Sequence, residues 1–180
     1  MSLSRLAVLK MVVKLKLERS PRRTELAKKT WNEKLRSAEG LPKVVRLSPK
    51  MARRWGGRTC AIPSPDEIKE LMGRIPKGKV TTVAEIRKAV ARRHGAEIGC
   101  PLTCGIFVWI VANAANEDLE SGRRRIVPYW RTLKAGGLLN PRYPGGVARH
   151  RKLLEAEGHR IEKAGEHYRV SGYEKKLVRL

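Results

Sequence analysis

The segment "PLTCGIFVWIVANAANE", residues 101–117, constrains the fold more than any other part of the chain. Its pattern predicts a helix that is apolar on nearly every face, and such a helix must be buried, either in the chain's own core or against another protein. A helix that reads phosphates and base edges should instead show Arg, Lys, Ser or Asn. We therefore expect residues Thr103–Ala115 to be packing surface rather than a nucleic-acid-reading surface.

Three further helices surround this segment in the sequence. "SPDEIKELMGRIPKG" offers Ser64 as an N-cap with Pro65 at the first helical position, and "TTVAEIRKAVARRHG" begins at a capping threonine. "GGVARHRKLLEAEGHR" predicts the last helix, "RRRIVPYW" and "TLKAGGLLN" predict two short strands, and "EHYRVSG" predicts a terminal strand. Three helices followed by a strand-rich wing are typical of a winged helix, a mostly helical α/β fold that often binds nucleic acid.

The formal net charge of +23 is unevenly distributed along the chain. Residues 1–60 hold 17 Lys/Arg against 4 Asp/Glu, a net of +13. One helix capped by Thr24 is predicted there, followed by an extended run, residues 41–65, that contains prolines and glycines. Such a segment buries too little apolar area to order by itself, so we expect it to order on a polyanion. The predicted organisation is a basic N-terminal extension (1–60), a winged-helix-like domain (61–165) and a basic C-terminal tail (166–180).

Several classes of protein are not indicated by the sequence. The segment "LAVLKMVVKLKL" is too short and too often interrupted by lysine to span a bilayer, and no signal-peptide cleavage site follows it. We therefore predict a cytoplasmic protein without a membrane partner. Cys60, Cys100 and Cys104 fit a reducing compartment, and we expect the last two to be buried small residues rather than zinc ligands. No metal site and no cofactor are predicted, and no role is assigned to the four histidines.

Four motifs in order resemble the C-terminal domain of the alkylguanine-DNA alkyltransferases and the related alkyltransferase-like proteins. They are "IPKGKVTT" (Ile75–Thr82), "VPYWR" (Val127–Arg131), "YPGG" (Tyr143–Gly146) and "KLLEAEGHRI" (Lys152–Ile161), and the resemblance covers about residues 64–162. It implies an alkyltransferase-type winged-helix domain, which would be joined here to an extended basic N-terminal arm.

The resemblance also implies that the repair chemistry is absent. The family uses a cysteine in a Pro-Cys-His-Arg turn, and this chain has Pro128-Tyr129-Trp130-Arg131, with Glu157 matching the glutamate that orients the histidine. A phenol with an ordinary pKa of about 10 is not a nucleophile toward an alkyl carbon at neutral pH. We expect no enzymatic activity. Tyr129 and Trp130 either fill the former pocket, stack on a nucleotide, or contact another protein.

Other departures fall on positions at which the family contacts DNA. Gly105 aligns with the arginine that replaces a flipped base, and Val83, Pro144 and His150 replace a tyrosine, a serine and a lysine. Together these changes predict that base flipping has been lost. The former pocket would then be a relic, made of Tyr129, Trp130, Arg131, Tyr143 and Glu157.

Two functions remain in view. The first is a structural RNA-binding protein, most simply a ribosomal protein bound to rRNA in the cytoplasm, with neighbouring ribosomal proteins packed on Thr103–Ala115. The second is an alkyltransferase-like protein that binds DNA, either alkylated guanine or DNA generally, without alkyl transfer. Phosphate contacts and stacking are predicted for Lys28, Lys29, Arg46, Lys50, Arg53, Arg54, Trp55, Arg58, Arg123, Arg124 and Arg125; Trp31 is a further stacking candidate.

Overall fold

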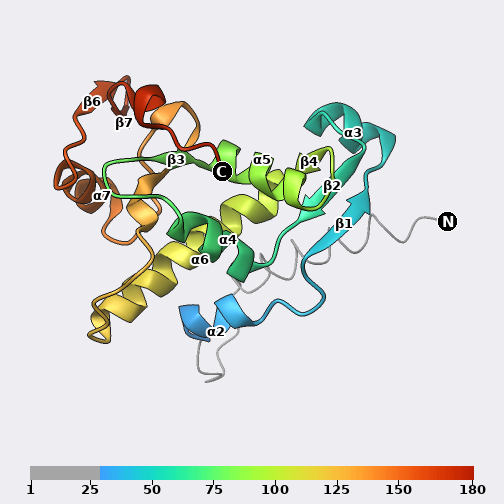
Figure 1. Cartoon of the computed structure of the whole chain (residues 1–180), viewed down its shortest axis with the longest axis horizontal. Helices are drawn as coiled ribbons and strands as arrows, with labels where there is room; N and C mark the ends of the chain where they lie inside the picture. Colours follow the sequence, from blue (N-terminus) through green and yellow to red (C-terminus); the bar gives the residue numbers. More distant parts are fainter. Residues whose placement is uncertain (1–28) are drawn as a thin grey trace.

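A long helix, α6 (Pro101–Glu120), runs through the middle of the molecule, and three helices, α2 (Trp31–Arg36), α4 (Pro65–Gly73) and α5 (Val83–Arg93), pack against it (Figure 1). The computed structural model describes residues 29–180, so the predictions on Thr24 and Lys28 lie outside the described residues. Most of the core side chains belong to α6 and to the helices that touch it. The remaining helices are α3 (Pro49–Trp55) and α7 (Gly146–Glu155), with 3-10 turns η1 (Tyr129–Arg131), η2 (Ala135–Gly137) and η3 (Tyr173–Lys176).

Local sequence signals explain where α4 and α5 begin. The Ser64 hydroxyl accepts a hydrogen bond from Glu67 N at 3.1 Å, and the Thr82 hydroxyl accepts one from Glu85 N at 3.3 Å. Each satisfies an N–H group that the first turn of a helix leaves without an intrahelical partner. The predicted starts of both helices are confirmed, and so is the burial of α6.

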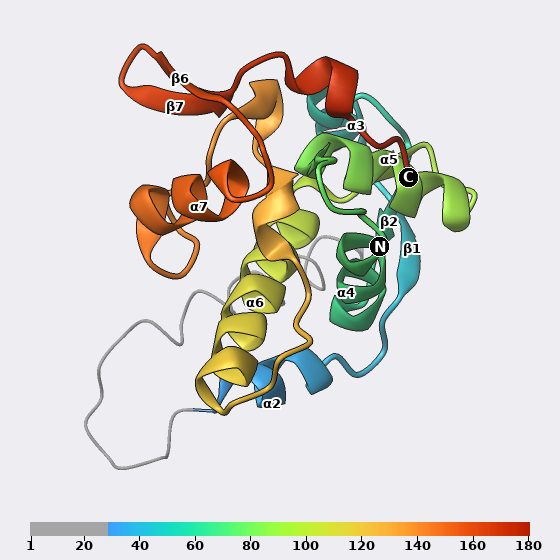
Figure 2. The same cartoon turned by 60° about the vertical axis from the view of Figure 1, so that its left-hand side comes forward.

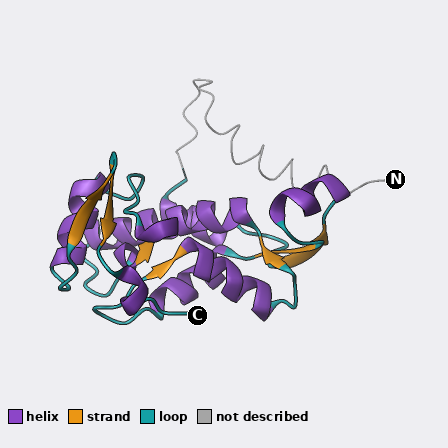
Figure 3. Ribbon diagram, turned by 90° about the horizontal axis from the view of Figure 1, so that it is seen from above, coloured by secondary structure: helices purple, strands orange, loops and turns teal. Residues whose placement is uncertain are grey.

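Residues 29–180 contain three small sheets, two of which pair strands that are far apart in the sequence (Figure 3). In the first, β1 pairs antiparallel with β2, which pairs parallel with β4; in the second, β3 and β5 are parallel; in the third, β6 and β7 form an antiparallel hairpin. The fold is therefore α/β and mostly helical, as predicted. The strands are β1 (Lys43–Arg46), β2 (Thr59–Ile62), β3 (Thr81–Thr82), β4 (Ile98–Gly99), β5 (Thr132–Leu133), β6 (Ile161–Ala164) and β7 (His167–Val170).

Residues 29–60 are part of this body, which corrects the prediction that they form an extension without a core. Leu35 of α2 is 4% exposed in the main core, and Trp31 meets Trp109 of α6 edge to face, with ring centroids 4.7 Å apart. The Glu117 carboxylate of α6 accepts hydrogen bonds from the N–H groups of Trp31 and Asn32, the first turn of α2. Figure 2 shows α2 lying across the end of α6.

The extended run predicted for residues 41–65 is also wrong, because it folds into β1, α3 and β2. The predicted domain boundary between residues 60 and 61 falls inside β2. Cys60 and Cys100 are fully buried with Ile62 in a cluster beneath this sheet. Sequence periodicity missed the segment because β1 and β2 are only four residues long, too short for a strand pattern to stand out.

The C-terminal part differs from the prediction in two ways. The two strands expected before residue 140 are replaced by η1 and by β5, whose partner is β3 some fifty residues earlier. The predicted terminal strand is confirmed as β7, but residues 166–180 are not a separate tail. The chain end returns to the domain, where Val178 N donates to Val80 O at 2.8 Å and Val80 N donates to Lys176 O at 3.0 Å.

Candidate nucleic-acid interface

β1, α3 and the turn that leads into β2 form a lobe at one end of the molecule, which we call the basic lobe, residues 43–58 (Figure 1). It contains no acidic residue. Pro49 begins α3, and Gly56 ends it in the left-handed conformation with φ 77°. No residue of α3 is fully buried, so this helix presents its side chains mainly to solvent. The cations of the basic lobe are Lys43, Arg46, Lys50, Arg53, Arg54 and Arg58.

Carboxylates neutralise little of this charge. Within residues 29–180, Arg58 is the member of the basic lobe with an acidic partner, Glu97, at 3.1 Å. Hydrogen bonds from the Arg58 backbone and guanidinium hold the pKa of the Glu97 carboxyl below its usual value. Arg46, Lys50, Arg53 and Arg54 are all exposed. A surface with this surplus of unpaired cations suits a polyanionic partner.

The aromatic residues predicted to stack on bases are engaged inside the protein. Trp55 is half-buried and packs on the Cys60–Ile62–Cys100 cluster, where it anchors α3 to the sheet. Trp31 is held against Trp109, and Lys34 lies over its ring at 4.2 Å from the centroid. The structure therefore favours packing over base stacking for both rings.

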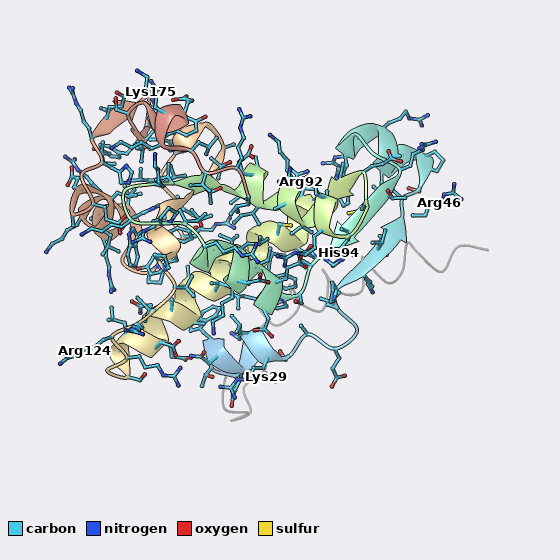
Figure 4. The ribbon with its side chains drawn as sticks, viewed as in Figure 1. Lys29, Arg46, Arg92, His94, Arg124 and Lys175 are labelled. Atoms are coloured by element: carbon cyan, nitrogen blue, oxygen red, sulfur yellow. The ribbon has the colours of Figure 1, made fainter. Side chains whose placement is uncertain are left out.

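The other predicted cations do not join the basic lobe in one patch. Arg123, Arg124 and Arg125 are exposed in the loop after α6, and Arg123 pairs with Asp118 at 3.0 Å. Figure 4 shows Arg46 and Arg124 at opposite ends of the molecule, with Lys29 near α2. The sequence-predicted residues thus form at least two separated surfaces.

The turn Pro128–Arg131, which we call the Tyr129 turn, is packed against the protein's own side chains. Tyr129 is 1% exposed, and its ring meets Trp130 and Tyr143 edge to face at centroid distances of 5.4 and 5.3 Å. The Tyr143 hydroxyl donates to Thr132 O at 2.8 Å. Of the three interpretations of Tyr129, this geometry favours pocket filling, because a buried ring cannot stack on a nucleotide.

Glu157 holds the Tyr129 turn in place. Its carboxylate accepts hydrogen bonds from the Arg131 guanidinium, from Trp130 Nε1 at 2.9 Å and from Gly78 N at 3.2 Å. Burial alone would raise the pKa of Glu157, but these hydrogen bonds outweigh burial and hold the pKa below its usual value. Glu157 therefore fixes the Tyr129 turn to the loop after α4.

His150, to which the sequence assigned nothing, fixes the other side of the turn. Asn140 N donates to Nδ1 at 3.1 Å, so Nε2 carries the proton and donates to Trp130 O at 2.8 Å. The side chain is fully buried, and burial lowers the pKa of His150 to about 4. The imidazole is therefore neutral at pH 7 and serves as a structural connector.

The exposed side of α6 offers no cation. Leu102 is 43% exposed, Ile106 and Trp109 are half-buried, and the helix contains no Lys or Arg. Trp109 Nε1 donates to Arg142 O at 3.1 Å, so this ring is tied to the loop before α7. Base reading from this helix, with hydrogen-bonding side chains in a groove, is not supported by its composition.

Sequence reasoning missed a second group of cations, between Glu120 and Glu155. No acidic residue occurs between Glu120 and Glu155, whereas Lys134, Arg142 and Arg149 lie in this stretch in addition to the predicted arginines. Scanning for acid-free stretches, rather than for clustered cations, would have found them. Within residues 29–180, no helix has the length and hydropathy needed to cross a bilayer, and no group of His, Cys, Asp or Glu is arranged to hold a metal ion.

Comparison with known proteins gives a distant structural likeness. No protein-family model matches the chain, and no curated protein matches it significantly. The chain is similar to the crystal structure of S. pombe Atl1 in complex with damaged DNA containing O6-carboxymethylguanine, with a TM-score of 0.43, and to S. pombe ATL in complex with DNA, with a TM-score of 0.46. Each is 21% identical and covers 64% of this chain and 94% of its own. A likeness at this level assigns no function.

Proposed function

We propose that this chain is a non-catalytic protein that binds the phosphate backbone of nucleic acid through outward-facing cations. The observation that carries the proposal is the basic lobe, with six cations within residues 43–58 and no acid. Among the described residues, a single carboxylate, that of Glu97, pairs with them. Lys and Arg placed in this way neutralise phosphates and release counterions, which provides affinity without sequence information.

The packing of the Tyr129 turn supports binding without base flipping. The Tyr129 ring is buried, so it leaves no space there for a flipped base. Trp130 and Arg131 donate hydrogen bonds to the Glu157 carboxylate. Burial raises the pKa of the Tyr129 phenol, so the phenolate needed for any nucleophilic step is even less available than in a free tyrosine. Neither alkyl transfer nor capture of an alkylated guanine fits this arrangement.

DNA is the nucleic acid that we propose first. Its support is the set of four sequence motifs between Ile75 and Ile161, which resemble those of a DNA-binding family. The resemblance implies the fold of that family, and it also implies that the positions used there to bind a lesion carry other residues in this chain. Binding to duplex backbone generally, rather than to a lesion, agrees with both implications.

A structural role on ribosomal RNA in the cytoplasm is the second candidate. The observation in its favour is the apolar outer side of α6, where Leu102, Ile106 and Trp109 would suit a neighbouring protein. A ribosomal protein has such neighbours, whereas a general DNA binder does not need them.

The test is equilibrium binding, by fluorescence anisotropy, of three short probes at several salt concentrations. The probes are a DNA duplex, the same duplex with one O6-alkylguanine, and a folded RNA of similar length. We expect the two duplexes to bind equally, because the pocket is filled. A preference of about tenfold or more for the alkylated duplex would refute the claim that Tyr129 leaves no room for an alkylated base. Tighter binding to RNA, with co-sedimentation on one ribosomal subunit after a high-salt wash, would establish the second candidate instead.

A further inference from the structure

The positive charge of the described residues lies at the two ends of the molecule. Residues 29–180 carry a net charge of +17, of which the stretches 43–58 and 121–154 contribute +6 and +9. The first stretch is the basic lobe. The second holds nine cations and no acid, and we call the part of the molecule that it forms the distal end. Figure 4 shows Arg46 of the basic lobe and Arg124 of the distal end at opposite ends of the longest axis.

The body between these two stretches is electrically balanced. Residues 61–120 hold eight Lys/Arg and eight Asp/Glu. Some of these charges pair with one another, as Glu70 does with both Arg74 and Arg93. α6, which lies in this body, contains no Lys or Arg and exposes Leu102. A nucleic acid laid along the body would therefore meet no net positive charge between the two ends.

α6 sets the separation of the two ends. β1 of the basic lobe belongs to the sheet that ends in β4, which lies one residue before α6 begins, and the arginine-containing loop 123–125 follows the last turn of α6. A helix of 20 residues is about 30 Å long. Interactions between exposed charges are largely screened beyond about 8–10 Å at physiological salt. The cations of one end therefore do not help to hold phosphates at the other.

Many cations of the distal end face solvent without an acidic partner. Within residues 29–180, carboxylates pair with Arg123, Arg131 and Arg151. Five others are exposed and have no carboxylate within ion-pair distance among these residues: Arg124, Arg125, Lys134, Arg142 and Lys152. The distal end thus has the unpaired positive charge that phosphate binding requires, as the basic lobe has.

We propose that one copy of this chain binds two separate DNA duplexes, one at the basic lobe and one at the distal end, and so bridges them. This inference rests on the proposed function and extends it from one phosphate-binding surface to two. Each end contacts backbone without reading sequence, so the two duplexes need not share a sequence. When both belong to one long DNA molecule, the second contact becomes intramolecular and strengthens the first.

The experiment measures the capture of one duplex by another. An unlabelled duplex is fixed to beads, and the retention of a fluorescent duplex is measured as the full-length chain is added. Both have about 20 base pairs, about 68 Å at 3.4 Å per pair, so either one is long enough to reach both ends. We expect capture to rise and then fall with protein concentration, because excess protein occupies every duplex separately. Sedimentation with excess duplex should give two duplexes per chain.

Two variants locate the two contacts, and a third controls for total charge. The lobe variant carries Lys50→Gln, Arg53→Gln and Arg54→Gln, and the distal variant carries Arg124→Gln, Arg142→Gln and Lys152→Gln. The control carries Arg74→Gln, Arg151→Gln and Arg169→Gln, at residues that already pair with carboxylates. The lobe and distal variants should each bind one duplex in place of two and lose about tenfold or more of the capture, whereas the control should keep both. All changed residues are exposed, so the melting temperature should stay unchanged.

The outcomes separate this inference from the proposed function. If the wild-type chain binds one duplex and captures none, bridging is refuted, while phosphate binding by the basic lobe stands. If the distal variant still captures, two copies of the chain associate and each holds one duplex, which also refutes the inference. If no duplex binds to the wild-type chain, the inference and the proposed function fail together.

Discussion

Replacing Tyr129 by alanine tests whether the Tyr129 ring is part of the core. The side chain is 1% exposed and contacts Trp130 and Tyr143, so its removal leaves a cavity that these two rings close only in part. Truncating a buried aromatic residue to alanine costs about 3–5 kcal/mol of unfolding free energy. For a chain of this size, that loss lowers Tm by about 6–20 °C.

The matched control is Tyr129→Phe. Because the hydroxyl has no partner within the described residues, removing it costs no protein hydrogen bond and should change the unfolding free energy by less than about 1 kcal/mol. Urea denaturation followed by tryptophan fluorescence measures both variants. If Tyr129→Ala is as stable as the wild-type protein, the ring is not buried as described, and a ligand-contacting role for Tyr129 returns.

Two further predictions concern Glu157 and His150, which hold the Tyr129 turn in place. Glu157→Gln should lower the unfolding free energy by about 3 kcal/mol, because it leaves the Arg131 guanidinium, 14% exposed, without its counter-charge; an unchanged urea midpoint would contradict that dependence. His150 has a folded-state pKa of about 4, depressed by burial, so its contribution is present above the unfolded pKa of about 6.5 and lost as pH falls toward 4. The loss should reach about 3 kcal/mol, and stability measured at pH 7 and pH 4.5 should be much more alike in His150→Asn than in the wild-type protein.

The elements that sequence predicted well carry their own signals. Ser64 and Thr82 mark the starts of α4 and α5 by short-range capping, and α6 is identified by apolar composition alone. The burial of Tyr129 was also among the expected alternatives, on the basis of the resemblance of its turn to a cysteine-containing turn of the alkyltransferases.

The elements that sequence missed depend on partners far away in the chain. Leu35 becomes a core residue only because α6 provides the surface on which α2 lies, and β1 and β2 acquire their place through β4. β5 is two residues long and is recognisable only through its pairing with β3. The structural role of Glu157 was hidden for the same reason, because its partner Arg131 lies 26 residues away in the sequence.

The central claim is that the basic lobe binds nucleic-acid phosphates. It is tested most directly by the salt dependence of duplex binding for a triple variant in which Lys50, Arg53 and Arg54 are changed to glutamine. The control removes the same charge from Arg74, Arg151 and Arg169, which already have carboxylate partners. The account predicts that the lobe variant loses at least about tenfold in affinity and about two to three units of salt slope, with a much smaller effect in the control. Equal losses in the two variants would mean that only total charge matters and would contradict the account.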